Sequence, residues 1–402
     1  MLEGLDRLMR GRTCILITHS PRLARTADRI VELDQGRIVR ERKPSRKPQL
    51  DRLLDRDAAR EILTRSLGPG ETLGDVTLAR VAYRPGKRAL AHYRAGAGDA
   101  VIVTGNEGAG TYDAGEDVTV TWLPFDPRLP ALGAHPDELA RRLDLEPDGE
   151  PALLRYKPRA RAVLRWGDHV LKAYGERAEF DAAVGGLRAD LPLPTAAFEA
   201  ALPDLRLTMQ RRVAGALPHS AAAAAGEAGE TVAKLQHAAL HHLPAAPPER
   251  QLAEAQAKAE LIAAVAPELR ARVEPLLHRL TRELPIKAAL RPAHGDFHVD
   301  QFLQATNGLA VIDFDGLCLA APAFDLATYA ADVVRGRGDD REAVEAVLAP
   351  LLDGYGERPN ALDWHLSAAI LTRAAHPFHR QVPAWRERME AMVTTAEGYT
   401  HA

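Results

Sequence analysis

The feature that most constrains the fold is the segment 293–316, which reads AHGDFHVDQFLQATNGLAVIDFDG. Two short apolar stretches, 301–305 and 310–314, flank the dipeptide Asn307-Gly308. Asn-Gly between apolar runs is the strongest short-range signal for a two-residue β-hairpin turn. The segment therefore predicts an antiparallel hairpin with polar residues at its open end.

The register that this turn would set places Phe302 opposite Asp313 and Gln301 opposite Phe314. Gln301 and Asp313 are then expected at the same open end of the hairpin, one rung apart. Asp296 lies five residues before Gln301, in a loop that leads into that end. Carboxylate and carboxamide oxygens that converge in this way suit Mg²⁺, which proteins bind through one or two carboxylates together with substrate phosphates.

This arrangement is also the one that kinases use for phosphoryl transfer. One aspartate orients the hydroxyl that receives the phosphoryl group, a carboxamide a few residues later holds a metal ion, and a second aspartate joins that metal to the phosphates. Asp296, Gln301 and Asp313 occur in that order and with that type of spacing.

The motifs HGDFHVDQ and VIDFDG resemble the catalytic and metal-binding motifs of the aminoglycoside phosphotransferase-like kinases. The resemblance covers roughly residues 150–385 and implies a two-lobed, protein-kinase-like fold that binds ATP and Mg²⁺. It implies that Asp296 is catalytic, that Gln301 and Asp313 are metal ligands, and that Asp315 is an auxiliary ligand. The family usually has Asn at the place of Gln301, and Gln with an IDFDG segment looks more like the maltokinase and glucosamine kinase branch.

A kinase-like N-lobe should supply a lysine for the phosphates and a glutamate that orients it. Lys172 lies on a predicted strand, and Glu179 follows seven residues later on a predicted helix, with Glu176 as the weaker candidate partner. The hinge that would receive the adenine is predicted at Gln210 to Val213. The turn 157–161 (KPRAR), which would cover the nucleotide, contains no glycine.

The order of elements predicts an α+β fold, because strand patterns dominate up to about residue 212 and Ala-rich helical patterns follow. The segment 40–49 (RERKPSRKPQ) has no apolar residue and two prolines, which is typical of a linker. The predicted domains are an N-terminal fragment, a linker, a cap-like α/β region, an N-lobe with hinge, and a helical C-lobe, at residues 1–40, 41–49, 50–149, 150–212 and 213–402.

The first 40 residues resemble the C-terminal end of an ABC-transporter ATP-binding domain. LITHS would be a buried strand that ends in the switch histidine, His19, and ADRIVELDQGRIV would be the closing hairpin of that domain. The rest of such a domain is missing, because the chain has no G-x-x-x-x-G-K-[ST] phosphate loop. Either the chain is a fragment of a longer transporter–kinase fusion, or this remnant is vestigial.

Composition excludes several other classes of function. The net charge of −3 argues against a general nucleic-acid binder, and two cysteines provide no disulfide framework. No apolar run approaches the ~20 residues that a membrane-spanning helix needs, and the start lacks the apolar core of a signal peptide. These features predict a cytoplasmic protein without direct membrane insertion.

The function that fits best is an ATP- and Mg²⁺-dependent phosphotransferase acting on a hydroxyl of a small molecule, such as a sugar, amino sugar or aminoglycoside. The C-terminal segment 361–391 has few carboxylates, which favours a neutral sugar or amino sugar over a strongly cationic aminoglycoside. The alternatives are a kinase-like regulatory module of an ABC transporter, or a fragment of a bifunctional ABC ATPase–phosphotransferase. Transporter subunits are expected partners only in the fusion case.

Overall fold

The structure is a computed structural model that describes residues 30–34, 37–42, 48–146, 149–240, 242–285, 289–305, 308–334 and 341–400. The chain divides into two compact units, residues 1–61 and 62–402. In the first unit, β1 (Ile30–Asp34) and β2 (Arg37–Arg42) pair antiparallel, as the sequence predicts. His19 and most of the predicted linker lie outside the described residues. Two helices follow, α3 (Pro48–Leu54) and α4 (Arg56–Arg65), and the second of them crosses the division between the units.

The second unit begins with a five-stranded antiparallel sheet in the order β3-β4-β5-β7-β6. Its central strand buries the consecutive residues Val101, Ile102 and Val103 on both faces, so the sheet is covered on each side. A short helix follows the sheet. The bounds are β3 (Val76–Arg84), β4 (Arg88–Ala95), β5 (Gly98–Thr104), β6 (Thr111–Asp113), β7 (Val118–Trp122) and α5 (Pro136–Leu143).

A second five-stranded sheet has the order β11-β12-β10-β9-β8, and helix α6 (Arg177–Leu187) follows β10. Its strands are β8 (Ala152–Lys157), β9 (Arg161–Trp166), β10 (His169–Tyr174), β11 (Phe198–Leu202) and β12 (Leu207–Arg211). Successive side chains along β10 point to opposite faces of the sheet. Leu171 packs in a core with Trp166 and Met209, where each fully buried side chain contributes about 1.5–3 kcal/mol. Lys172 therefore points to the opposite face.

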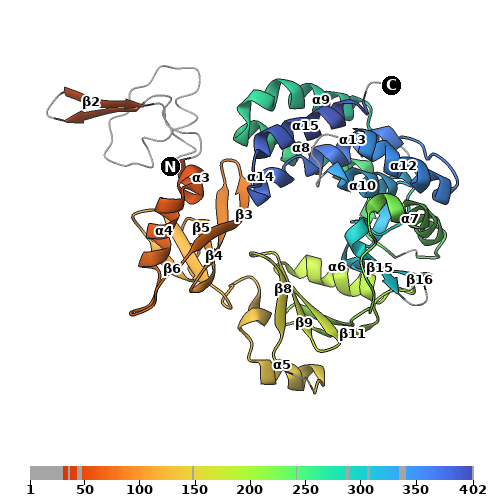
Figure 1. Cartoon of the computed structure of the whole chain (residues 1–402), viewed down its shortest axis with the longest axis horizontal. Coiled ribbons are helices and arrows are strands. Elements are labelled where there is room, and N and C mark those ends of the chain that lie inside the picture. The colour runs from red at the N-terminus through yellow and green to blue at the C-terminus, as the bar shows by residue number, and fades with distance from the viewer. Residues whose placement is uncertain are drawn as a thin grey trace. The chain divides into compact units, whose positions relative to one another are not determined.

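The rest of the chain is mainly helical (Figure 1). Its helices are α7 (Ala221–Gln236), α8 (Pro248–Val265), α9 (Arg270–Arg282), α10 (Ala323–Asp332), α12 (Arg341–Tyr355), α13 (Leu362–Arg373), α14 (His376–Arg380) and α15 (Trp385–Glu397). Ser220 begins α7 by accepting a hydrogen bond from the Ala223 amide at 3.1 Å. A Cβ at Gly229 would lie 2.0 Å from the Leu351 carbonyl oxygen, so the close packing of α7 against α12 requires glycine there.

Short strands connect these helices and carry the loops of the predicted site. They form a sheet in the order β13-β17-β14 and a separate hairpin of β15 and β16. The bounds are β13 (Ala245–Ala246), β14 (Arg291–Ala293), β15 (Phe302–Ala305), β16 (Gly308–Val311) and β17 (Cys318–Ala320). With strands first and helices later, the predicted α+β class is confirmed.

Candidate active site

The hairpin at 302–311 has a different register from the predicted one. Phe302 pairs with Val311 and Ala305 with Gly308, whereas the sequence argument placed Phe302 opposite Asp313. The reason is that Gly308 pairs with Ala305 and so belongs to a strand, whereas the sequence argument placed it in the turn. The predicted register is therefore wrong by two residues.

Gln301 and Asp313 nevertheless lie close together, as the sequence predicts. The Ile312 amide donates to the Gln301 carbonyl oxygen at 2.9 Å, which continues the pairing beyond the strands. Asp313 then leaves the strand in the left-handed region, at φ 70° and ψ 45°. Its side chain accepts a hydrogen bond from Gln301 Nε2 at 3.4 Å, and the same Nε2 lies 3.1 Å from His298 Nε2. Gln301 and Asp313 thus lie together at the open end of the hairpin.

The loop that carries Asp296 is held by backbone hydrogen bonds to buried side chains. The Asp325 carboxylate on α10 accepts from the amides of His294 at 2.6 Å and Gly295 at 3.1 Å. His294 Nε2 lies 2.9 Å from the Ile312 carbonyl oxygen and therefore carries the proton, which leaves Nδ1 to accept from the Asp296 amide at 3.3 Å. His294 and Asp325 thus fix the loop, and Asp296 itself is 66% exposed.

Gly295 explains why this loop needs a glycine before the aspartate. Its φ is +90°, and a Cβ there would lie 2.1 Å from the carbonyl oxygen of Gly316. Any other side chain would push the Asp296 loop away from the segment that follows Asp313. The HGD and DFDG motifs are therefore in direct backbone contact.

Lys172 reaches the same place from the second sheet. Its ammonium lies 2.6 Å from Asp313 Oδ1 and 3.0 Å from Asp315 Oδ1, although more than 140 residues separate it from either. The Tyr174 hydroxyl donates to Asp315 Oδ2 at 2.9 Å. Arg161 NH1 lies 3.1 Å from Asp315 Oδ2 and 3.8 Å from Asp313 Oδ1. Two cations and two carboxylates thus form one compact network.

Burial and charge act in opposite directions on the pKa values of this network. Burial favours neutral Lys172, but the two carboxylates outweigh it and raise the pKa of that ammonium. Burial would raise the pKa of Asp313, but Lys172 and Arg161 lower it below its ordinary value. Burial and the neighbouring Asp313 carboxylate raise the pKa of Asp315, although Lys172 opposes them. Asp313 is therefore the carboxylate that keeps its negative charge most firmly.

The predicted pairing of Lys172 with Glu179 is not what the structure contains. Glu179 lies in the first turn of α6 and is exposed, while Lys172 is bound by Asp313 and Asp315. The weaker candidate, Glu176, pairs with Arg128. The ammonium prefers the carboxylates because they lie next to it in a buried site, whereas Glu179 keeps its hydration on the surface.

Sequence reasoning missed Arg161 and the way its turn is anchored. Arg159, two residues before Arg161 in the same turn, has a φ of 62°. Its amide donates a hydrogen bond to Asp126 Oδ2 at 2.9 Å. The buried Arg159 guanidinium lies 3.4 Å from Glu107 and 3.9 Å from Asp126, and the Tyr156 hydroxyl also donates to Asp126 at 2.8 Å. The glycine-free turn is therefore held by two acidic residues from the cap-like region, which no local sequence signal indicates.

The predicted hinge lies at the end of β12. Gln210 is buried in that strand, opposite Val170 of β10, and Val213 comes two residues after the strand ends. The amides of Arg211 and Arg212 already donate to the carbonyl oxygens of Ala197 and Asp168, at 2.8 and 2.7 Å. Adenine recognition by Gln210 to Val213 stays a prediction.

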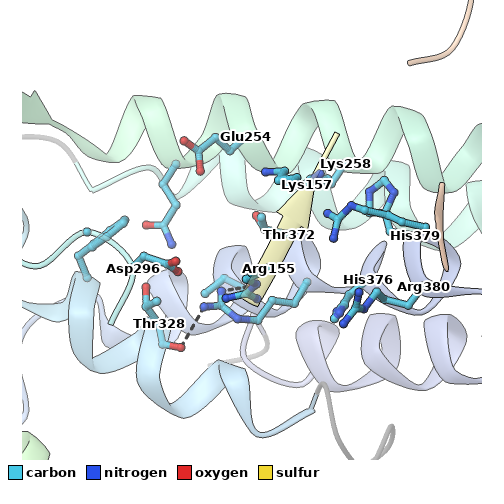
Figure 2. Close-up of a pocket in the computed structure, with 16 residues that line it drawn as sticks. Arg155, Lys157, Glu254, Lys258, Asp296, Thr328, Thr372, His376, His379 and Arg380 are labelled. Atoms are coloured by element: carbon cyan, nitrogen blue, oxygen red, sulfur yellow. Dashed lines mark hydrogen bonds between the residues drawn. The ribbon is translucent and has the colours of Figure 1, made fainter. Parts of the chain in front are cut away.

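Two cavities meet at Asp296. One, of about 500 Å³, is lined by Asp296, Gln301, Asp313, Arg161 and Glu179, among others. The other, of about 380 Å³, lies against the helices and is shown in Figure 2. His376 and His379 from the C-terminal segment line it. Trp364, His365 and Phe378 from the same segment are buried in the core instead.

The donor atoms around Asp313 suit a hard cation. Asp313 and Asp315 supply carboxylate oxygens beside the Gln301 carboxamide, and Mg²⁺ takes its remaining ligands from water and phosphate. In the described part of the chain, no group of three or more His, Cys, Asp or Glu side chains could hold a metal ion by itself. The positive charge that these carboxylates need is supplied by Lys172 and Arg161.

Residues 153–365, more than half of the chain, match the model of the Phosphotransferase enzyme family. The chain belongs to this family, and the prediction of a kinase-type phosphotransferase is confirmed. No curated protein sequence matches the chain.

Several solved structures resemble it at low identity. A choline/ethanolamine kinase family protein from Mesorhizobium loti is 15% identical, with a TM-score of 0.46 over 66% of this chain and 94% of that one. A macrolide 2′-phosphotransferase, MphH from Brachybacterium faecium, is 20% identical, with a TM-score of 0.41 over 64% and 96%. The gentamicin complex of APH(2″)-IIa is 12% identical, with a TM-score of 0.46 over 65% and 96%.

None of the helices within the described ranges has the length and hydropathy needed to cross a membrane.

Proposed function

We propose that this protein transfers the γ-phosphoryl group of ATP to a hydroxyl of a small-molecule acceptor, with Mg²⁺ as cofactor. One observation carries the proposal. Asp296, Gln301 and Asp313 line one cavity, and Lys172 reaches them from the second sheet, with its Nζ 2.6 Å from Asp313. Family membership supports the reaction class.

Each residue has a role in this proposal that follows from its position. Asp296, exposed at the junction of the two cavities, orients the acceptor hydroxyl and takes its proton as the oxygen–phosphorus bond forms. The bond between the γ-phosphorus and the bridging oxygen breaks, and ADP leaves with that oxygen. Bound Mg²⁺ would neutralise phosphate charge, held by Gln301, Asp313 and Asp315.

Lys172 has to change partners in such a reaction. Its ammonium is shared between Asp313 and Asp315. A bound triphosphate would attract Lys172 and Arg161, and a metal ion would replace their charge beside the carboxylates. Gln301 presents Nε2 to Asp313 and would turn its carboxamide to offer Oε1 to the metal.

Two further parts of the proposal, the branch of the family and the origin of the N-terminal segment, rest on the sequence. Gln301 with the IDFDG segment favours the maltokinase and glucosamine kinase branch, and the segment around His19 favours an ABC-domain remnant. An upstream reading frame that encodes a phosphate loop would support a transporter fusion with transporter subunits as partners.

The first experiment measures ADP release from Mg-ATP with a panel of sugars, amino sugars, sugar phosphates, sugar acids, aminoglycosides and choline. We expect turnover that depends on an acceptor and that falls by at least about 10²-fold in Asp296→Asn. Firm ATP binding without any stimulation, and without an effect of Asp296→Asn on the residual rate, would instead support the regulatory module.

A further inference from the structure

The cavity of about 380 Å³ beside Asp296 has a strong excess of positive charge. Six cationic side chains line it against only two carboxylates, Glu254 and Asp296. The cations are Arg80, Arg155, Lys157, Lys258, Arg373 and Arg380, and they are joined by His376 and His379. In Figure 2, Glu254 and Asp296 are seen toward one end of the cavity and His376, His379 and Arg380 toward the other.

Most of this charge is not neutralised by the protein. Arg373 is paired with Asp332 at 3.4 Å, and Glu254 lies 3.6 Å from Arg250 outside the cavity lining. Among the described residues, no carboxylate lies within ion-pair distance of Arg155, Lys157, Lys258 or Arg380. Burial, together with Arg80, lowers the pKa of both Lys157 and Lys258. Gathering these cations costs free energy that a bound anion would recover.

The two cavities share part of this charge. Arg80, Arg155, Lys157 and Arg380 line both, whereas Lys258 and Arg373 line only the cavity of about 380 Å³, called the helical cavity below. Lys258 on α8 and Arg373, His376 and His379 on α13 and α14 line only the helical cavity. Gln301, Asp313 and Arg161, which would serve the triphosphate, line only the other cavity. Asp296 lines both. A molecule in the helical cavity with a hydroxyl at Asp296 would therefore place its other end near Lys258, on the side away from the nucleotide cavity.

We propose that the acceptor is a small hydroxylated molecule that carries an anionic group, a phosphate monoester or a carboxylate, bound by Lys258 and Arg380. This inference rests on the proposed phosphotransferase function and names its substrate class. A dianionic phosphate fits the charge excess better than a carboxylate, and the Arg380 guanidinium can bind phosphate through two parallel hydrogen bonds. A polycationic aminoglycoside would be repelled. A neutral sugar, which the sequence favoured, would leave the cations uncompensated.

The test compares acceptors in the full-length protein. ADP release is measured with a hexose, the corresponding hexose phosphate, the corresponding uronic acid and an aminoglycoside. We expect the anionic acceptors to have the highest kcat/KM, with the phosphate arm ahead of the carboxylate arm. A neutral or cationic acceptor with equal or higher kcat/KM would overturn the inference while leaving the phosphotransferase function intact.

The matched variants are Lys258→Gln in the cavity and Lys234→Gln as control. Lys234 is an exposed residue of α7 that pairs with Glu230. Loss of a charge-assisted hydrogen bond should raise KM for the anionic acceptor about tenfold or more in Lys258→Gln, with a much smaller change in kcat. Lys234→Gln should change neither. An unchanged KM in Lys258→Gln would contradict the assignment.

A binding measurement keeps the two proposals apart if no turnover is found. Calorimetry with the hexose phosphate and no nucleotide should detect binding that weakens by the same factor in Lys258→Gln. Binding of this kind without phosphoryl transfer would retain the anion site and refute the phosphotransferase proposal. No binding, or binding that Lys258→Gln leaves unchanged, would overturn the anion site.

Discussion

Two charged regions on either side of Asp296 differ in how their charge is balanced. In the Lys172 network, two cations meet two carboxylates, and every charged group has an oppositely charged neighbour within 3.1 Å. In the helical cavity, six cations meet two carboxylates. Balanced buried charge fixes side chains in one arrangement, whereas an excess that the protein leaves uncompensated is available to a ligand.

The two regions should therefore respond differently to the loss of one charge. Removal of a cation from the balanced network leaves a buried carboxylate uncompensated, which destabilises the protein. Removal of a cation from the cavity relieves repulsion, so stability should stay the same or rise while anion binding weakens. The following variants test this contrast, beginning with the largest expected effect.

Lys172→Met removes the central cation of the balanced network. Met fills a similar volume, but Asp313 and Asp315 then face each other with only Arg161 between them. We expect a loss of about 3–5 kcal/mol in the free energy of unfolding, together with loss of phosphoryl transfer. Denaturant unfolding measures the first and ADP release the second.

The control for this variant is Lys258→Met, which removes a cation from the cavity by the same substitution. Its free energy of unfolding should match or exceed that of the unchanged protein, because Arg80 and its neighbours no longer repel an ammonium there. Equal destabilisation by both substitutions would show that the two regions do not differ as described.

Asp126→Asn tests balance in a second buried cluster, the one that holds the 157–161 turn. The amide oxygen of Asn can still accept from Tyr156 and the Arg159 amide, so the substitution removes the charge and the hydrogen bond from the Arg128 amide to Oδ1. Arg159 would keep Glu107 at 3.4 Å. We expect a smaller loss than for Lys172→Met, about 1–3 kcal/mol, in the same unfolding measurement. A loss as large as that of Lys172→Met would mean that Glu107 does not share the charge.

Sequence reasoning located the residues of the site where they are close together in the chain. Asp296, Gln301 and Asp313 lie on one loop and one hairpin, and the short connection brings them together even though the predicted register was wrong. The error had a local cause, because Asn-Gly marks a turn but does not say whether Gly308 belongs to the turn or to the strand. A shift by two residues also keeps each side chain on the same face, so the convergence survived.

What the sequence could not supply were contacts across long stretches of chain. Nothing near Lys172 indicates that its partners are Asp313 and Asp315 rather than the nearby Glu179. The helical cavity is the extreme case, since its cations come from β3, β8, α8, α13 and α14. Few carboxylates in 361–391 pointed to an acceptor that is not cationic, but the positive charge became visible only when Arg155 and Lys258 were placed beside that segment.

The smallest predicted effect is a pH dependence that only the unbalanced region should have. Lys258 faces Arg80 and Arg84 from β3, His379 from α14, and Lys157 from β8, with Glu254 as the acidic group on its own helix. Burial and Arg80 lower its pKa, so it loses its proton at a lower pH than an ordinary lysine. Burial and Lys258 lower the pKa of His379 to about 3, so His379 stays neutral between pH 7 and pH 10.

A bound anion favours protonated Lys258, and affinity for a hexose phosphate should therefore weaken as the pH rises from 7 towards 10. Lys258→Arg keeps its charge over that range and should flatten the dependence by a few fold, measured by calorimetry. If the unchanged protein and Lys258→Arg weaken in parallel, the titrating group lies elsewhere, and Lys258 does not distinguish the cavity from the balanced network.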